Sequence, residues 1–315
     1  MSTQTSSKDT SCGEKMQDDN LAMMCCASCG TAGGDDIKLK KCTACYLVKY
    51  CSVKCQKEHR PKHKKACKKR AAELRDELLF KQPEGRHTGD CPICSLPLPI
   101  DMHQSTFMTC CSTLICNGCD CFNQKREVEG RLQLKCPFCR KAVPETDEDV
   151  DERLMKRMEV NDPAAIGEMG TKRFNKGDYV TALEYWTRAA ALGDVIAHYQ
   201  LSCLFNEGKG VEKDKKRELH HLTEAAIGGH PSARFNLAIL EKNNGRVDRA
   251  VKHWIIAAKL GHDQSLKCVK DLYQAGFASK EDFVGALRGY QAAIDAMKSP
   301  QREEATKRSV PMLMA

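Results

Sequence analysis

The chain lacks the features of a secreted or membrane protein. None of its apolar runs approaches the ~20 residues that a membrane span needs, so no span is expected. Its first 20 residues are polar throughout, without the apolar core of a secretory signal. We therefore expect an intracellular protein, cytoplasmic or nuclear. In a reducing compartment cysteines favour metal binding over disulfides.

Signatures of common enzymes and nucleic-acid binders are also missing. The sequence has no glycine-rich phosphate loop and no Ser/His/Asp set with a recognisable local pattern. The net charge is +8, and a basic run, KHKKACKKR, occupies residues 62–70. Such a run could bind nucleic acid or an acidic partner, or direct nuclear import. No aromatic residues interleave the lysines to stack on bases, so we favour a solvated helix face and do not expect nucleic-acid binding.

Cysteine is abundant and unevenly placed. Of 20 cysteines, all but Cys203 and Cys268 precede residue 140. Most fall into two patterns of eight ligands. A Cys-x2-Cys pair places two thiolates one tight turn apart, and two such pairs close a tetrahedral zinc site that leaves no position for substrate. Metal in this chain should therefore support folding rather than hydrolysis.

The first pattern contains seven cysteines and one histidine. Cys26 is preferred over Cys25 because only Cys26 has x2 spacing to Cys29. His59 is expected to be a surface residue, because the set is complete without it. The pattern reads Cys26-x2-Cys29-x12-Cys42-x2-Cys45-x5-Cys51-x3-Cys55-x7-His63-x3-Cys67.

The second pattern contains only cysteines. Cys121 and His103 are weaker contenders for a ligand position nearby. The pattern reads Cys91-x2-Cys94-x15-Cys110-Cys111-x4-Cys116-x2-Cys119-x16-Cys136-x2-Cys139.

The ligand order of the first pattern, with Tyr50-Cys51-Ser52 and Cys55-Gln56, resembles a MYND finger. The resemblance implies two interleaved zinc sites and a surface that binds proline-containing peptides of partner proteins. Arg60 stands where many MYND fingers carry a tryptophan. The implied ligand sets are Cys26, Cys29, Cys51 and Cys55 for one zinc and Cys42, Cys45, His63 and Cys67 for the other.

The second pattern, with CPIC at 91–94 and CPFCR at 136–140, resembles an all-cysteine RING finger. That resemblance implies a ubiquitin ligase without a nucleophile, which holds a ubiquitin-conjugating enzyme and its ubiquitin in a reactive arrangement. Ile93, Pro137 and Arg140 match the contact positions for the conjugating enzyme. Asn123 stands where a large apolar residue is usual. The implied ligand sets are Cys91, Cys94, Cys116 and Cys119, and Cys110, Cys111, Cys136 and Cys139.

The last half of the chain repeats. Ala-Ala-x-x-Gly recurs with Gly193, Gly229 and Gly261, at separations of 36 and 32 residues. A large apolar residue, such as Trp186 or Trp254, precedes the alanines and is expected in the core. This period indicates paired helices stacked in an α-solenoid. The glycine-rich turn at 206–214 resembles that of Sel-1-like repeats, which implies protein–protein scaffolding.

We therefore expect small zinc-stabilised modules followed by an all-α helical-repeat solenoid, with four Zn²⁺ per chain. A RING-type ubiquitin ligase is favoured, with MYND finger and repeats recruiting substrate or adaptor proteins. A non-enzymatic adaptor is the alternative, and enzyme activity stays open. The expected segments are a disordered tail (1–24), MYND finger (25–67), helix and linker (68–90), RING finger (91–140), acidic linker (141–160), solenoid (161–297) and disordered tail (298–315).

Overall fold

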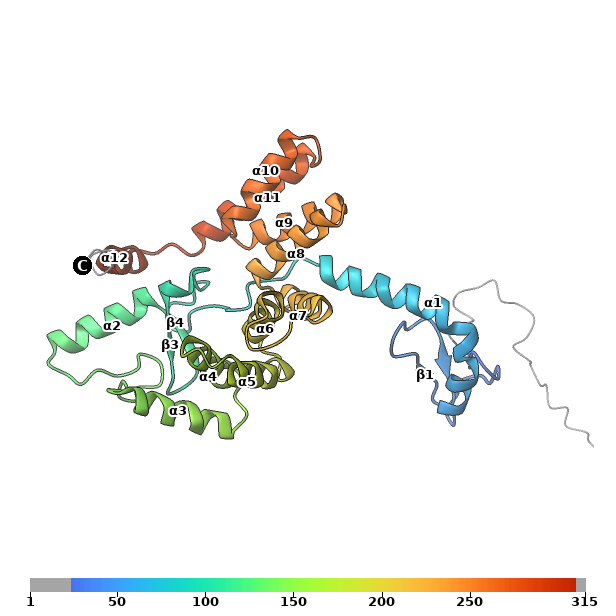
Figure 1. Cartoon of the computed structure of the whole chain (residues 1–315), viewed down its shortest axis with the longest axis horizontal. Coiled ribbons are helices and arrows are strands. Elements are labelled where there is room, and N and C mark those ends of the chain that lie inside the picture. Colours follow the sequence, from blue (N-terminus) through green and yellow to red (C-terminus); the bar gives the residue numbers. More distant parts are fainter. Residues whose placement is uncertain (1–23, 310–315) are drawn as a thin grey trace, which may run out of the picture. The chain divides into compact units, whose positions relative to one another are not determined.

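The computed structural model describes residues 24–309. The chain divides into two compact units between Leu79 and Phe80. Helices make up most of the described chain, and the short strands lie in its cysteine-rich parts (Figure 1). The expected fold class is confirmed, because cysteine-rich modules precede a solenoid of paired helices.

The first unit is a cysteine-rich fold attached to one long helix. Strands β1 (Lys40–Lys41) and β2 (Lys49–Tyr50) pair antiparallel, and helix α1 (Val53–Phe80) follows. The lysines of the basic run are exposed on α1, as expected. The core of this unit consists mainly of cysteine side chains packed with Tyr50, which is 3% exposed. So small an apolar core needs metal to fold.

The second unit begins with the second cysteine-rich module. Short helix η1 (Met102–Gln104) leads into strand β3 (Ser105–Met108), which pairs antiparallel with β4 (Thr113–Cys116). Helix α2 (Asn117–Glu129) follows β4 directly. Leu98 and Ile115 are fully buried among the cysteines and form the apolar part of this core.

The segment expected to be an acidic linker contains a helix. Helix α3 (Asp147–Glu159) starts at Thr146, whose side chain and that of Asp149 form a reciprocal capping box. Acidic residues in the first turn favour a helix start because they offset its positive dipole end. Leu154 and Met158 pack into the solenoid core. The acidic residues that suggested a linker are therefore a helix N-terminus.

Four antiparallel helix pairs form the solenoid (Figure 1). Gly193, Gly229 and Gly261 end a helix with φ of 90°, 87° and 92°, a region that costs glycine nothing. The next residue, Asp or His, caps the following helix through its side chain. The helices are α4 (Pro163–Asn175), α5 (Tyr179–Ala191), α6 (Val195–Glu207), α7 (Lys215–Ile227), α8 (Pro231–Asn243), α9 (Val247–Lys259), α10 (Asp263–Gln274) and α11 (Lys280–Asp295).

Trp186 and Trp254 lie in the solenoid core, which confirms their interpretation as packing residues. Each is 2% exposed, and they belong to two different apolar clusters. The Trp186 indole lies against the backbone of α4, because a Cβ on Gly170 would come within 2.6 Å of its Cδ1. Ala286 of α11 is fully buried in the second cluster, so the weak fourth repeat also packs.

The C-terminal segment differs from the expected disordered tail. Residues Pro300–Ser309 form helix α12, which packs against α2 of the second module. Arg302 is 8% and Ala305 3% exposed, while their described neighbours in the helix are exposed. Two buried residues three apart in a polar sequence give almost no periodic signal, so the sequence did not predict this helix.

Candidate metal centres

The structure brings the expected ligands together in four groups of four. Within each group, all ligand atoms lie within 4.8 Å of one another. Cys25, Cys121 and His103 belong to none of these groups among the described residues. The groups are Cys26, Cys29, Cys51 and Cys55; Cys42, Cys45, His63 and Cys67; Cys91, Cys94, Cys116 and Cys119; and Cys110, Cys111, Cys136 and Cys139.

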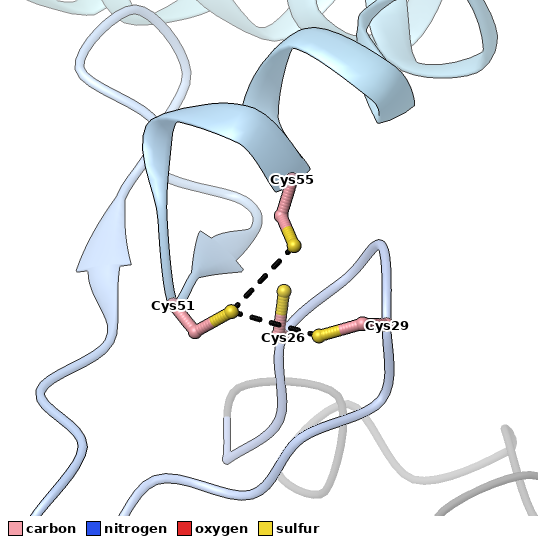
Figure 2. A group of neighbouring side chains, drawn as sticks. All are labelled: Cys26, Cys29, Cys51 and Cys55. Atoms are coloured by element: carbon pink, nitrogen blue, oxygen red, sulfur yellow. Dashed lines mark hydrogen bonds between the residues drawn. The ribbon is translucent and has the colours of Figure 1, made fainter.

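The first group joins a loop to the start of α1. Figure 2 shows the four sulfurs turned toward one another, with Cys55 on α1 and Cys51 just before it. The Cys51 sulfur lies 3.5 Å from that of Cys29 and 3.6 Å from that of Cys55. Tetrahedral zinc with Zn–S bonds of about 2.3 Å separates two sulfurs by about 3.8 Å. These separations suit a zinc ion.

The second group uses one turn of α1. His63 and Cys67 are four residues apart, so both side chains lie on one face of the helix. The His63 Nε2 atom is 3.1 Å from the Cys45 sulfur, and the Cys42 and Cys67 sulfurs are 3.8 Å apart. Mixed sulfur and imidazole donors at these separations also fit tetrahedral zinc.

His59 has a role that the sequence did not reveal. Its ring stacks on that of His63, with centroids 5.7 Å apart, and its Nδ1 atom is 3.1 Å from the hydroxyl of buried Tyr50. His59 is half-buried rather than a free surface residue, and burial lowers its pKa. The stacked ring of His59, held by Tyr50, restricts the rotation of the His63 ring.

The third and fourth groups lie in the second module. The Cys94 and Cys116 sulfurs are 3.8 Å apart. Adjacent Cys110 and Cys111 both turn into the fourth group, where Cys110 lies 3.2 Å from Cys139 and Cys111 lies 3.9 Å from Cys136. Cys110 and Cys111 are adjacent, which is a tighter spacing than usual, but both sulfurs can still reach the same metal position.

One backbone turn recurs at four Cys-x2-Cys pairs. In each, the residue after the second cysteine donates its amide to the carbonyl of the first, at 2.8–3.0 Å, and has a positive φ. This turn directs two sulfurs and nearby amides to one point, which suits a metal–thiolate site. Only one of the four residues in that position is glycine, and it has the highest φ, 74°. The four residues are Gly30, Tyr46, Ser95 and Arg140.

Charge also indicates a cation in these groups. Hydrogen bonding with Cys116 lowers the pKa of Cys91 to about 4, and the same pairing raises the pKa of Cys116. Burial and hydrogen bonding to Cys139 raise the pKa of Cys110. One thiol of such a pair thus ionises at the expense of its neighbour, and a group in which every cysteine is a thiolate needs a bound cation. The donor chemistry fits zinc in all four groups.

The residues expected to contact a conjugating enzyme lie on the second module. Ile93 is 43% exposed and Pro137 is half-buried. Arg140 is engaged within the module, because its Nη1 atom donates to Asn123 Oδ1 at 3.3 Å and lies 3.7 Å from the carboxylate of Glu127. Asn123 and Glu127 are themselves buried, at 7% and 1% exposure. Asn123 therefore belongs to an internal polar network.

Comparisons with known proteins support the first module and the solenoid. A MYND-finger family model matches residues 26–67, and a Sel1-repeat model matches residues 166–194, 195–230 and 231–262. The expected MYND finger and Sel1-like repeats are confirmed. A MYND finger implies bound zinc, and the two kinds of module together suggest a protein-interaction adaptor.

Similarity to individual proteins is weaker. Over 175 residues the chain is 24% identical to DAP3-binding cell death enhancer 1 of Mus musculus, covering 43% of this chain and 34% of that protein. The chain thus spans about a third of this relative's length. A Sel1 repeat protein from Oxalobacter formigenes is 23% identical, with a TM-score of 0.41, over 50% of this chain and 68% of that one. A protective antigen of uropathogenic Escherichia coli with an SLR fold is 21% identical, with a TM-score of 0.38, over 52% and 37%.

The residues that the structure describes include no helix with the length and apolar character to cross a membrane.

Proposed function

We propose that the chain is a zinc-dependent protein-interaction adaptor whose two cysteine modules and solenoid each dock partner proteins. The observation that carries the proposal is the closure of all four ligand groups. Each group already supplies four converging donors, so the metal sites serve to shape surfaces rather than to bind a substrate. The similarity to a DAP3-binding cell death enhancer supports a protein ligand.

The solenoid contributes a cavity of about 650 Å³ to this proposal. Glu168, Thr171 and Gln200 line it from the solenoid, and Phe107 and Leu114 from the second module. Burial raises the pKa of Glu168. Apolar walls with a few polar groups are typical of ligand-binding sites, and in the adaptor this one would take a side chain of a partner peptide.

Proximity labelling in the native cells tests the adaptor. Gln200→Arg would place a longer, charged side chain in the cavity and should remove one set of partners, whereas Gln274→Arg, on exposed α10 surface, should remove none. Cys29→Ser should remove a different set by opening the first zinc group. If both cavity and zinc variants keep every partner of the wild type, the adaptor proposal is wrong.

A RING-type ubiquitin ligase is the second candidate. The exposure of Ile93 and of Phe138, 43% and 50%, favours it, because exposed apolar residues on zinc loops suit a docking surface. The Asn123 network weighs against it, because a buried polar cluster replaces an apolar contact.

Ubiquitin discharge from a panel of conjugating enzymes separates the two functions. If the chain is an active ligase, the wild type should speed ubiquitin discharge and Ile93→Ala should slow that discharge strongly. The zinc content of the variant should equal that of the wild type. If the zinc-loaded wild type stimulates no conjugating enzyme, the ligase candidate is wrong and the adaptor remains as the proposed function.

A further inference from the structure

Helix α12 comes unusually close to α2. A Cβ placed on Gly118 would lie 2.9 Å from both the backbone nitrogen and the Cγ atom of Arg302. Only a glycine at this position of α2 leaves room for the two helices. Ala305, one turn further along α12, is also buried. Helices α2 and α12 are thus closely packed against each other, although they lie far apart in the sequence.

The Arg302 side chain reaches the loop that carries two metal ligands. Its Nη1 atom donates to the carbonyl of Pro97 at 2.7 Å, and its Nη2 atom donates to that of Leu96 at 3.2 Å. The Leu96 carbonyl also accepts from the amide of Cys91, at 2.9 Å. Arg302 therefore braces the turn that holds Cys91 and Cys94 together.

Arg302 also contacts a ligand atom directly. Its Nη2 atom donates to the Cys94 sulfur at 3.4 Å. Four thiolates around Zn²⁺ carry a net charge of −2, which a nearby buried cation offsets. A guanidinium supplies that charge and several fixed donors at once. Hydrogen-bonding partners of metal ligands commonly change metal affinity by ~10–100-fold.

We propose that Arg302 is a positioning residue of the metal site formed by Cys91, Cys94, Cys116 and Cys119, supplied by the C-terminal helix. The inference rests on the proposed zinc occupancy of this site. Coupling between two sites is reciprocal, so α12 docking strengthens zinc retention and bound zinc strengthens α12 docking. The second module is then complete only with a residue from the other end of the solenoid.

Zinc release from the full-length, zinc-loaded chain tests this role. Arg302→Met keeps an apolar stem beside Gly118 but removes the charge and the donors. We expect one of four zinc ions to pass to a chromogenic chelator ~10–100-fold faster. Arg302→Lys, which keeps the charge without the fork, should be intermediate. Lys307→Gln removes a charge from the exposed side of the same helix and should release zinc like the wild type.

Cysteine alkylation, followed by mass spectrometry, identifies the site that loosens. In Arg302→Met, Cys94 and Cys116 should react faster, while Cys110 and Cys139 of the neighbouring site keep the wild-type rate. A general structural loss would expose all four cysteines equally and would overturn the positioning role.

A second variant displaces the helix without changing Arg302. Gly118→Ala should raise hydrogen exchange of residues 300–307 and speed zinc release from the same site. Wild-type release rates in both Arg302→Met and Gly118→Ala, with the second module fully loaded, would overturn this inference alone. A different result would overturn the zinc assignment itself. If the cysteines of the wild-type second module are alkylated at the same rate with and without zinc, that module does not bind zinc, and this inference fails with it.

Discussion

Replacing Trp186 with alanine probes how the solenoid is held together. The indole is 2% exposed and packs with Phe174, at a ring-centroid distance of 5.4 Å. Its Nε1 atom donates to the Gly167 carbonyl at 3.1 Å. The residue thus joins α5 to α4 through both apolar contact and one hydrogen bond.

The expected loss of stability follows from these contacts. Truncating a buried tryptophan to alanine costs ~3–5 kcal/mol, and more where the site cannot collapse. The backbone of α4 lies directly against the indole at Gly170, so collapse would require moving a helix. The lost hydrogen bond adds little, because the Gly167 carbonyl still accepts from the Thr171 hydroxyl. We expect ~4–5 kcal/mol, or a melting shift of ~8–20 °C for a unit of this size.

Thermal melting by circular dichroism and denaturant titration measure this change. Leu192→Ala, at the end of the same helix, is the control, because Leu192 is 45% exposed and should change stability by less than ~0.5 kcal/mol. Zinc content should stay at the wild-type value in both variants. If Trp186→Ala and Leu192→Ala have the same melting temperature, the Trp186 indole does not pack as described.

Three further predictions concern metal and pH. Elemental analysis of metal-replete protein should return four zinc ions per chain, and two or fewer would mean that one cysteine module does not bind zinc as assigned. A strong chelator should unfold the cysteine modules but leave most helical circular dichroism, because α4–α11 are stabilised by apolar stacking; loss of the whole helical signal would contradict this division. Burial lowers the pKa of His87 to about 4 from 6.5, so the stability that this residue contributes should be complete above pH 6.5 and fall by about 2 kcal/mol at pH 5, where the unfolded state binds the extra proton. His87→Phe should make this slope shallower by that share only, because burial also lowers the pKa of His221 to about 4 and that of His230 well below its usual value; a slope equal to that of the wild type would contradict the burial of His87.

The four ligand groups could be predicted because the spacing of the ligand residues along the chain determines their geometry. Four of the five Cys-x2-Cys pairs form the same turn with different residues after the second cysteine, as Tyr46 and Arg140 show by adopting the same positive φ as Gly30. In the fifth pair, Cys119 lies in helix α2 instead. The repeat was equally readable, since Gly193 and its equivalents recur with the buried alanines. In both cases a local pattern determines a local structure.

Long-range partners were not predictable. Arg140 lies outside both ligand sets, and the RING resemblance implied only a contact with the conjugating enzyme, yet Arg140 contacts the buried carboxylate of Glu127. Lys135 donates its backbone amide to the same carboxylate at 2.8 Å. A buried charge depends on its partners, so an Arg140 substitution can destabilise the module. Arg140→Ala is therefore a poor probe of ubiquitin transfer, and Ile93→Ala is a better one.

The contact of Arg302 with the second module has a consequence for protein synthesis. Cys139, the last cysteine of this module, leaves the ribosome long before Arg302 does. At ~5–20 residues per second, the roughly 160 intervening residues take about 8–30 s to translate. During that interval the solenoid is being made while the site around Cys94 lacks its guanidinium. A nascent chain can therefore take up zinc early at this site but gains the bracing of α12 only after Arg302 has been translated.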